Sequence, residues 1–113
     1  MDDSFRLSNP TKEHLTAAQV YQVETDRKPM REMIGQFVLV DVVIQIARDV
    51  PLAIIELDGQ VPDANHRLHA HFENIKHYTD KPLHEGDRFR IEGILVDECY
   101  DAYMIYLTAL KRL

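Results

Sequence analysis

Apolar residues, many of them β-branched, gather in five separate stretches of this chain, and polar residues, glycine or proline separate the stretches. Such residues favour strands, and alternate side chains of a strand point to the same face of a sheet. The pattern therefore predicts five strands, at residues 36–48, 52–57, 67–73, 87–96 and 102–111. In the fourth stretch the apolar side chains and a glycine share one face and the charged side chains share the other: Phe89, Ile91, Gly93 and Leu95 against Arg88, Arg90 and Glu92.

A helical pattern precedes the strands. Apolar residues recur between Thr11 and Pro29, and proline stops a helix, so we expect a helix at residues 12–26. Short helical turns are expected at 29–33 and 74–78, and the polar residues 1–10 are expected to form a flexible terminal segment. We expect the helix to cover the open end of its own sheet, the alternative being that it packs on another subunit or protein.

The number and order of these elements indicate a small closed sheet. Five strands, with a long first strand and the main crossover between the third and fourth, are typical of the OB fold. Gly93 in the middle of a strand predicts a sharp bend or a close backbone approach. At 113 residues the chain has the size of one domain, placed at residues 11–113. The predicted fold is mainly β: a five-stranded OB-type Greek-key barrel with an N-terminal α-helix.

Three stretches of the sequence carry a family resemblance. They are Leu15-Thr16-Ala17-Ala18-Gln19-Val20-Tyr21-Gln22-Val23-Glu24, then Ile34-Gly35-Gln36-Phe37-Val38, and finally Gly86-Asp87 with Ile91-Glu92-Gly93. This pattern resembles the tRNA-anti-like group of small bacterial OB-fold domains. The resemblance implies a short amphipathic helix before the barrel and a glycine that opens the first strand. It also implies kinship with tRNA-anticodon-binding barrels, but it supplies no catalytic residue.

Composition narrows the classes of partner. Thirteen Lys and Arg against nineteen Asp and Glu give a net charge of −6, which disfavours binding that depends on phosphate neutralisation. The single cysteine, Cys99, excludes an internal disulfide and a cysteine-rich zinc site. No apolar run is long enough to span a membrane, and the start of the chain has no secretory signal pattern. We therefore expect a soluble, cytoplasmic protein with no membrane partner.

Five of the six histidines fall within a short central stretch: His66, His69, His71, His77 and His84. His69 and His71 should project from one face of the third strand, roughly 6 to 7 Å apart. Together with Asp63 or His66 from the adjacent loop they form a candidate zinc site. A surface that responds to pH, or plain solvated or interface histidines, are the alternatives. No resident cofactor is expected.

A ligand of an OB-type barrel usually lies across its second and third strands, between the loops that follow the first and fourth. The candidate ligand-binding residues on these elements are Arg48, Arg67, His69, His71, Arg90, Tyr100 and Tyr103. The tyrosines could stack on bases and the arginines could meet phosphate. Asp97, Glu98 and Asp101 would repel phosphate from the same hairpin.

No set of residues in the sequence amounts to a reaction, because neither a carboxylate pair nor an activated nucleophile can be placed from spacing. We therefore expect a binding module that is not an enzyme. The favoured partner is another protein or a second copy of the chain, held through a face or edge of the barrel. The alternatives are binding of single-stranded DNA or RNA, and metal or pH sensing through the histidines.

Overall fold

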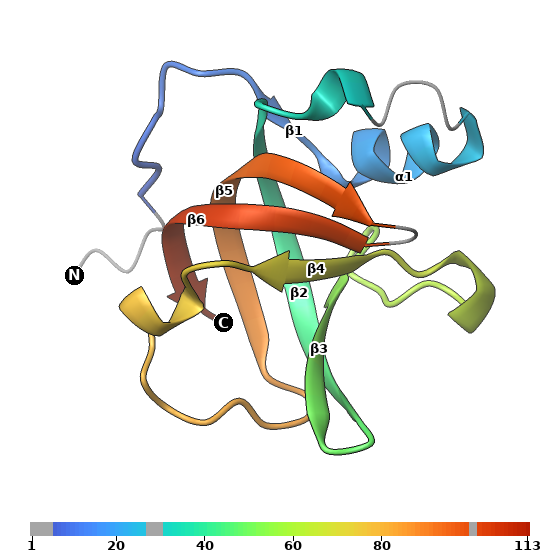
Figure 1. The fold of residues 1–113 in the computed structure, drawn as a ribbon, viewed down its shortest axis with the longest axis vertical. Coiled ribbons are helices and arrows are strands. Elements are labelled where there is room, and N and C mark those ends of the chain that lie inside the picture. Colours follow the sequence, from blue (N-terminus) through green and yellow to red (C-terminus); the bar gives the residue numbers. More distant parts are fainter. Residues whose placement is uncertain (1–5, 27–30, 100–101) are drawn as a thin grey trace.

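The computed structural model describes residues 6–26, 31–99 and 102–113 (Figure 1). These residues form one α-helix, α1 (Ala17–Asp26), and three short 3₁₀ helices, η1 (Arg31–Met33), η2 (Ala64–His66) and η3 (Ile75–His77). The strands are β1 (His14–Leu15), β2 (Phe37–Ala47), β3 (Val50–Ile55), β4 (His69–Phe72), β5 (Arg88–Cys99) and β6 (Ala102–Arg112). The prediction of a mainly β chain is confirmed.

All six described strands belong to one sheet. Its order is β1-β2-β3-β4-β6-β5, and β2 also pairs with β5, so the pairings run in a ring through β2, β3, β4, β6 and β5. The pairs β2–β3, β2–β5, β3–β4 and β5–β6 are antiparallel. The pairs β1–β2 and β4–β6 are parallel. Segments far apart in the sequence therefore lie side by side.

The long first strand presents alternate side chains to the two faces of the sheet. Val38, Val40, Val42 and Ile44 are buried, while the residues between them are half-buried. This alternation from Phe37 to Gln45 places one face of β2 against the core and the other face outward. The predicted strand at 36–48 is thus confirmed as β2, with ends one residue inside the prediction.

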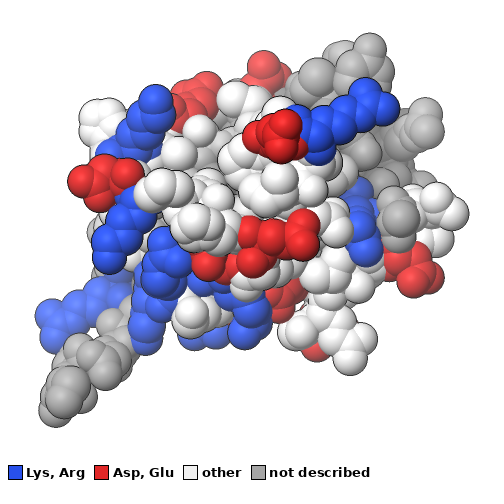
Figure 2. Space-filling model, turned by 90° about the horizontal axis from the view of Figure 1, so that it is seen from below, with Lys and Arg blue, Asp and Glu red and all other residues white. Residues whose placement is uncertain are grey.

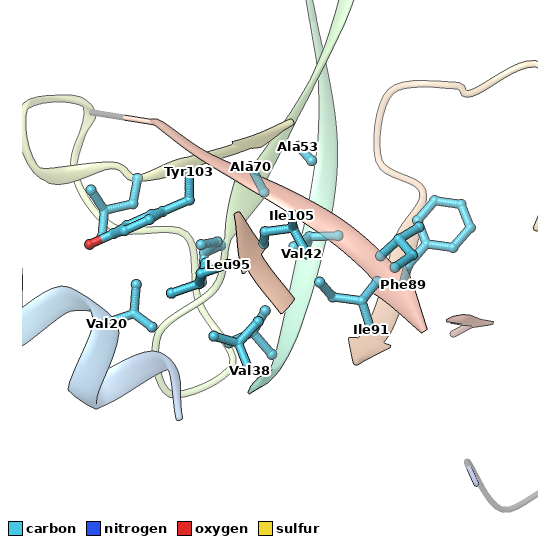
Figure 3. Packing of buried hydrophobic residues seen from close by; sticks show 14 of the residues in the cluster. Val20, Val38, Val42, Ala53, Ala70, Phe89, Ile91, Leu95, Tyr103 and Ile105 are labelled. Atoms are coloured by element: carbon cyan, nitrogen blue, oxygen red, sulfur yellow. The ribbon is translucent and has the colours of Figure 1, made fainter. Parts of the chain in front are cut away.

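The core lies on the inner face of the ring, where side chains of α1 and of all the long strands meet (Figure 3). Val20 of α1 packs beside Leu95 and Tyr103, and Phe89 with Ile91 fills the region farther along β5. Each large apolar side chain removed from water contributes about 1.5–3 kcal/mol. Burial of this one continuous cluster is what holds the strands in a ring.

Gly93 marks a close approach between β5 and β6. A Cβ at this position would meet Cγ2 of Ile105, and it would lie 2.8 Å from the carbonyl oxygen of Tyr106. The pairing register also shifts between Glu92 and Gly93, as expected of a β-bulge. The predicted close backbone approach at Gly93 is confirmed.

The start of the helix corrects the sequence prediction. The helix was expected at 12–26, but α1 begins at Ala17, and the residues before it form β1 against β2. Thr16 and Gln19 fix this start: Oγ1 of Thr16 accepts the amide of Gln19 at 3.3 Å, and Oε1 of Gln19 accepts the amide of Thr16 at 2.9 Å. This reciprocal capping box was present in the sequence as Thr-x-x-Gln.

The second strand also begins earlier than expected. The predicted break at residues 49–51 is replaced by a two-residue turn in which Arg48 and Asp49 both have positive φ, 50° and 65°. Two positive φ angles give a tight hairpin that follows the twist of the strands. The strand β3 therefore starts at Val50, and Pro51, whose missing N–H is tolerated near a strand end, lies within it.

The helix α1 packs on its own sheet, as expected. Val20 and Tyr21 are buried in the core, and the phenol hydroxyl of Tyr21 donates to the carbonyl of Ile55 at 2.5 Å. The same oxygen accepts the amide of Leu68 at 3.1 Å. Tyr21 thus joins the end of β3 to the start of β4 at the edge that α1 covers (Figure 1). Within the described part of the chain, no helix has the length and apolar character needed to cross a membrane.

Candidate functional site

The three predicted phosphate contacts do not converge. Arg48 is exposed at the tip of the β2–β3 hairpin, and Arg67 lies just before β4. Nε of Arg67 donates to the carbonyl of Pro62 at 2.8 Å and Nη1 donates to Oε1 of Gln45 at 3.2 Å. Arg90 points outward from β5 and binds a carboxylate. The structure therefore brings together no cationic cleft from these three side chains.

The candidate zinc ligands come from β4 and from the loop that precedes it. His69 and His71 are on β4, half-buried and exposed respectively, while Asp63 precedes η2 and His66 is its last residue. Across residues 6–26, 31–99 and 102–113, no group of three or more His, Cys, Asp or Glu side chains is arranged to hold a metal ion. The predicted zinc set is not assembled in this structure.

Of the two candidate tyrosines, Tyr100 and Tyr103, the structure describes Tyr103. Tyr103 has an exposed fraction of 0% and belongs to the core cluster, because the inner face of β6 carries it (Figure 3). A ring in this position cannot stack on a base at the surface. Tyr100 lies outside the described residues.

Glu92 is a buried carboxylate on the face of β5 that the sequence pattern assigns to charged side chains. It has an exposed fraction of 0%. Its Oε1 accepts the amide of Ser8 at 2.9 Å and the hydroxyl of Thr108 at 2.5 Å. Its Oε2 accepts the amide of Asn9 at 3.3 Å and Nε2 of His14 at 2.6 Å. We call the segment of residues 6–15 the N-terminal strap; Glu92 fastens it to the outer side of the sheet.

The charge of Glu92 is stabilised where it lies. Burial acts to raise the pKa of this carboxyl, but the hydrogen bonds from Thr108, His14 and the amides of Ser8 and Asn9 outweigh burial, so the pKa is below its ordinary value. The strap is therefore fastened by an ionised group. Strand alternation placed Glu92 on the outward face of β5, but alternation does not show that a distant segment covers this face.

Beside the strap, apolar side chains cross the outer face in one row. Phe37 of β2 lies directly opposite Ile94 of β5, and Ile94 lies opposite Tyr106 of β6. Phe37 and Ile94 are half-buried, and Tyr106 has an exposed fraction of 47%. Directly opposed side chains in a sheet are about 4.5–5.5 Å apart, so these three form a continuous strip. We call Phe37, Ile94 and Tyr106 the outer row.

The outer row has aromatic neighbours at both ends. The ring of His14 is 5.6 Å from the ring of Phe37, measured between centroids. At the other end Tyr78 donates its hydroxyl to the carbonyl of Leu107 at 3.0 Å. Burial raises the pKa of Tyr78, and the nearby charges of Tyr106 and Glu92 raise it further. Tyr78 therefore lies close to the exposed end of the row.

Basic side chains gather instead where β5 begins and β6 ends. Arg90 lies opposite Lys111 and Phe89 lies opposite Arg112 in the β5–β6 pair. Figure 2, the view from below, shows Lys and Arg side chains mostly on one side, with others on the opposite side and Asp and Glu side chains among them. The basic end, as we call it, consists of Arg88, Arg90, Lys111 and Arg112.

Acids neutralise most of the basic end. Arg88 binds Glu56 through two hydrogen bonds of 2.8 and 2.9 Å. Arg90 binds Asp41 through hydrogen bonds of 2.8 and 3.2 Å. Arg112 forms an ion pair of 3.2 Å with Asp87 and lies over the ring of Phe89. Arg88, Arg90 and Arg112 each have a carboxylate partner on the protein, which reduces their attraction for phosphate.

A hollow of about 260 Å³ lies between the start of α1, the middle of β2 and the loop after β3. It is lined by Ala17, Leu39, Val40, Asp41, Glu56, Asp58, Gly59 and Arg90. Two of its three carboxylates are those already bound to Arg88 and Arg90. The hollow therefore offers little free charge to a small ligand.

The sequence prediction missed Glu92 and the outer row. The outer row had a signal: apolar residues stand at positions that face away from the core, where alternation would place polar ones. The burial of Glu92 had no sequence signal, since a carboxylate between Ile91 and Gly93 fits a solvent-facing position. A comparison with protein-family models and one with curated proteins each found no match to this chain.

Proposed function

We propose that this chain is a non-catalytic OB-type binding module that contacts another protein, or a second copy of itself, through the outer row. The order of pairing in β2, β3, β4, β6 and β5 supports the OB assignment, with its parallel contact between the third and fifth long strands. The resemblance to the tRNA-anti-like group supports it as well. Fold alone does not assign function, so the proposal depends on the surface.

The outer row is the observation that carries the proposal. Phe37, Ile94 and Tyr106 cross three adjacent strands, and Val96, with an exposed fraction of 38%, extends the apolar surface toward the β5–β6 hairpin. Contiguous exposed apolar surface with polar surroundings marks protein interaction sites. Tyrosine is among the side chains that most often anchor such contacts. His14 of the strap contacts Phe37, and Tyr106 at the other end of the outer row remains exposed.

Site-specific cross-linking tests the proposal. A photo-reactive benzophenone side chain is placed at Tyr106 and, as the matched control, at Val50, an exposed apolar residue of the β2–β3 hairpin. Both proteins are irradiated in extracts of the cells that make the protein and, separately, in purified form. We expect covalent products from position 106 and none from position 50. Equal products from both positions, or none from position 106 in either setting, would contradict the proposal.

The basic end favours a second candidate function, binding of single-stranded DNA or RNA. Arg90 and Lys111 are directly opposed, with Arg88 and Arg112 beside them, so four cations share one end of the sheet. Binding there should weaken steeply with salt, because phosphate contacts release counterions. Fluorescence anisotropy with mixed-sequence oligonucleotides at low salt measures this, with Lys111→Gln as the test variant and Arg48→Gln as the control. No binding at micromolar protein would eliminate this candidate.

A further inference from the structure

The N-terminal strap and the ring of strands are held by different forces. The core cluster takes its buried side chains from α1, the strands β2 to β6 and the segments beside them, and of the strap residues Leu15 packs against it. The strap is attached instead by hydrogen bonds to Glu92 and by the two residue pairs of β1 with β2. Loss of the strap therefore leaves the apolar core of the ring in place.

The polar contacts of the strap converge on one carboxylate. The amides of Ser8 and Asn9 and the Nε2 atom of His14 all bond to Glu92, at 2.9, 3.3 and 2.6 Å. Ser8 also donates its hydroxyl to the carbonyl of Thr108 at 2.5 Å. Because three strap residues share one acceptor group, loss of its charge weakens their bonds together and not one at a time. A single proton on Glu92 thus acts on the whole strap.

The strap covers part of the outer face beside the outer row. Glu92 of β5 lies opposite Leu39 of β2, which is half-buried and lies two residues from Phe37 on the same face. The exposed fraction of Glu92 is 0%, and the ring of His14 is 5.6 Å from the ring of Phe37. Detachment of the strap therefore uncovers Glu92 and the ring of Phe37.

Other charged and titratable groups next to Glu92 come from the strap, from the end of η3 and from adjacent rows of the sheet. They are His14, Tyr78, Tyr106, Asp41, Arg90 and Lys111. Arg90 is held by Asp41, and the remaining charged strap residues, Arg6, Lys12 and Glu13, are exposed. Three of the four hydrogen bonds that lower the pKa of Glu92 come from the strap. Attachment of the strap and ionisation of Glu92 therefore favour each other.

We propose that the strap is an acid-released cover of the outer face: when Glu92 takes up a proton, the strap detaches as a unit while the ring of strands stays folded. The proton turns one carboxylate oxygen from an acceptor into a donor, which then faces donors of the strap or of Thr108. Detachment uncovers Phe37, and the neutral Glu92 adds no charge to the uncovered surface. The inference goes beyond the proposed function, because it holds whether or not the outer row binds a protein.

Hydrogen exchange followed by NMR tests the release. Protection of the Ser8 and Asn9 amides, relative to an unstructured chain at the same pH, is measured from about pH 7 to about pH 2.5. The amide of Ile55, bonded to the carbonyl of Leu68 at 3.0 Å, reports on the ring. The contribution of ionised Glu92 is present above its ordinary pKa of 4.5 and is lost as the pH falls through its lower pKa in the folded protein.

We expect the two strap amides to lose protection by about 10- to 100-fold below pH 4.5, as for the loss of a hydrogen bond to a charged group. Ile55 should keep its protection over the same range. Loss of protection at Ile55 together with the strap, or full protection of Ser8 and Asn9 down to the lowest pH, would overturn the inference.

Two variants separate Glu92 from the other acids that titrate in the same range. Glu92→Gln should show the released strap already at pH 7, with no further loss in acid. Asp87→Asn is the matched control, because the pKa of Asp87 is also lowered but its partners lie outside the strap. Wild-type protection of Ser8 and Asn9 in Glu92→Gln, or a strap released by Asp87→Asn, would contradict the assigned role of Glu92.

A soluble nitroxide tests whether release uncovers the outer face. The reagent 4-hydroxy-TEMPO broadens the NMR signals of side chains that it can reach. At pH 7 the ring signals of Phe37 should broaden more in Glu92→Gln than in wild type, while the methyl signals of the buried Ile44 should broaden equally in both. Equal broadening of Phe37 in the two proteins would show that the strap is not a cover.

Discussion

Replacement of Glu92 by Gln should release the N-terminal strap while the sheet remains folded. Glutamine keeps the shape of the side chain but removes its charge, and its amide group presents a donor where Glu92 presents an acceptor. The new NH₂ group replaces one of the two oxygens of Glu92. It then faces the donors that were bonded to that oxygen, which are Ser8 and Thr108 at Oε1 or Asn9 and His14 at Oε2. Ser8, Asn9 and His14 of the strap, and Thr108 of β6, thereby lose the carboxylate to which they are bonded.

The magnitude follows from the four hydrogen bonds. A hydrogen bond to a charged group contributes about 1.5–3 kcal/mol, and breaking a buried charged pair by removing one partner costs about 3–5 kcal/mol. Release of the strap lets water satisfy Ser8, Asn9 and His14, which limits the loss. We therefore expect the free energy of unfolding to fall by about 2–4 kcal/mol, and the melting temperature to fall on the order of 10 °C.

Urea unfolding followed by circular dichroism measures the stability, and amide hydrogen exchange at Ser8 and Asn9 measures the strap. Glu13→Gln is the matched control, because Glu13 is an exposed carboxylate of the same strap. Exchange at Ser8 and Asn9 should accelerate in Glu92→Gln and stay unchanged in Glu13→Gln. Wild-type exchange at both amides, with a stability loss below about 0.5 kcal/mol, would refute the reasoning.

The stability difference between wild type and Glu92→Gln should depend on pH in a defined direction. The pKa of Glu92 in the folded protein is below its ordinary value of 4.5, so the folded state favours the ionised form. The stability that this ionisation contributes is present above the unfolded pKa and is lost as the pH falls through the folded pKa. The gap in stability between wild type and Glu92→Gln should therefore be constant near neutral pH and shrink below about pH 4.5. A gap that widens in acid would contradict this sign.

Three further variants test the contacts that shape the sheet. Gly93→Ala should destabilise the protein by about 1–3 kcal/mol in urea unfolding, because the new Cβ meets Ile105; equal stability would show that β5 and β6 can separate there. Tyr21→Phe should cost about 1–3 kcal/mol, because Leu68 loses its acceptor, and a stability within error of wild type would contradict it. Thr16→Ala should cost about 1 kcal/mol and speed amide exchange in the first turn of α1; unchanged exchange there would rule out the capping role.

Local patterns predicted the elements well where one physical effect dominates. The alternation in β2 and the apolar face of β5 come from contact with one core, so their positions were correct within a few residues. The starts of α1 and β3 were wrong because short-range side-chain and backbone chemistry set them. The capping box at Thr16 is present in the sequence and marks the start of α1. A positive φ is unusual for arginine, so the turn at Arg48 has no comparable sequence signal.

The candidate site was harder to predict than the fold. Arg90 was expected to meet a ligand, but Asp41, 49 residues away in the sequence, holds it in an ion pair. Tyr103 was expected at a binding face, but the register of β6 places it in the core. Neither outcome can be derived from neighbouring residues, because each depends on which strands pair and in what register.

By itself the sequence determined the mainly β character of the chain, the place of each long strand, the inward face of β5, and the need for glycine at Gly93. These properties depend on periodicity and on residues close in the chain. Only the tertiary structure decided that Glu92 is buried under the strap, that acids neutralise the basic end, and that Phe37, Ile94 and Tyr106 form one exposed strip. The physical reason is that charge pairing and surface continuity depend on long-range register, which hydrophobic burial fixes only when the whole ring of strands has closed.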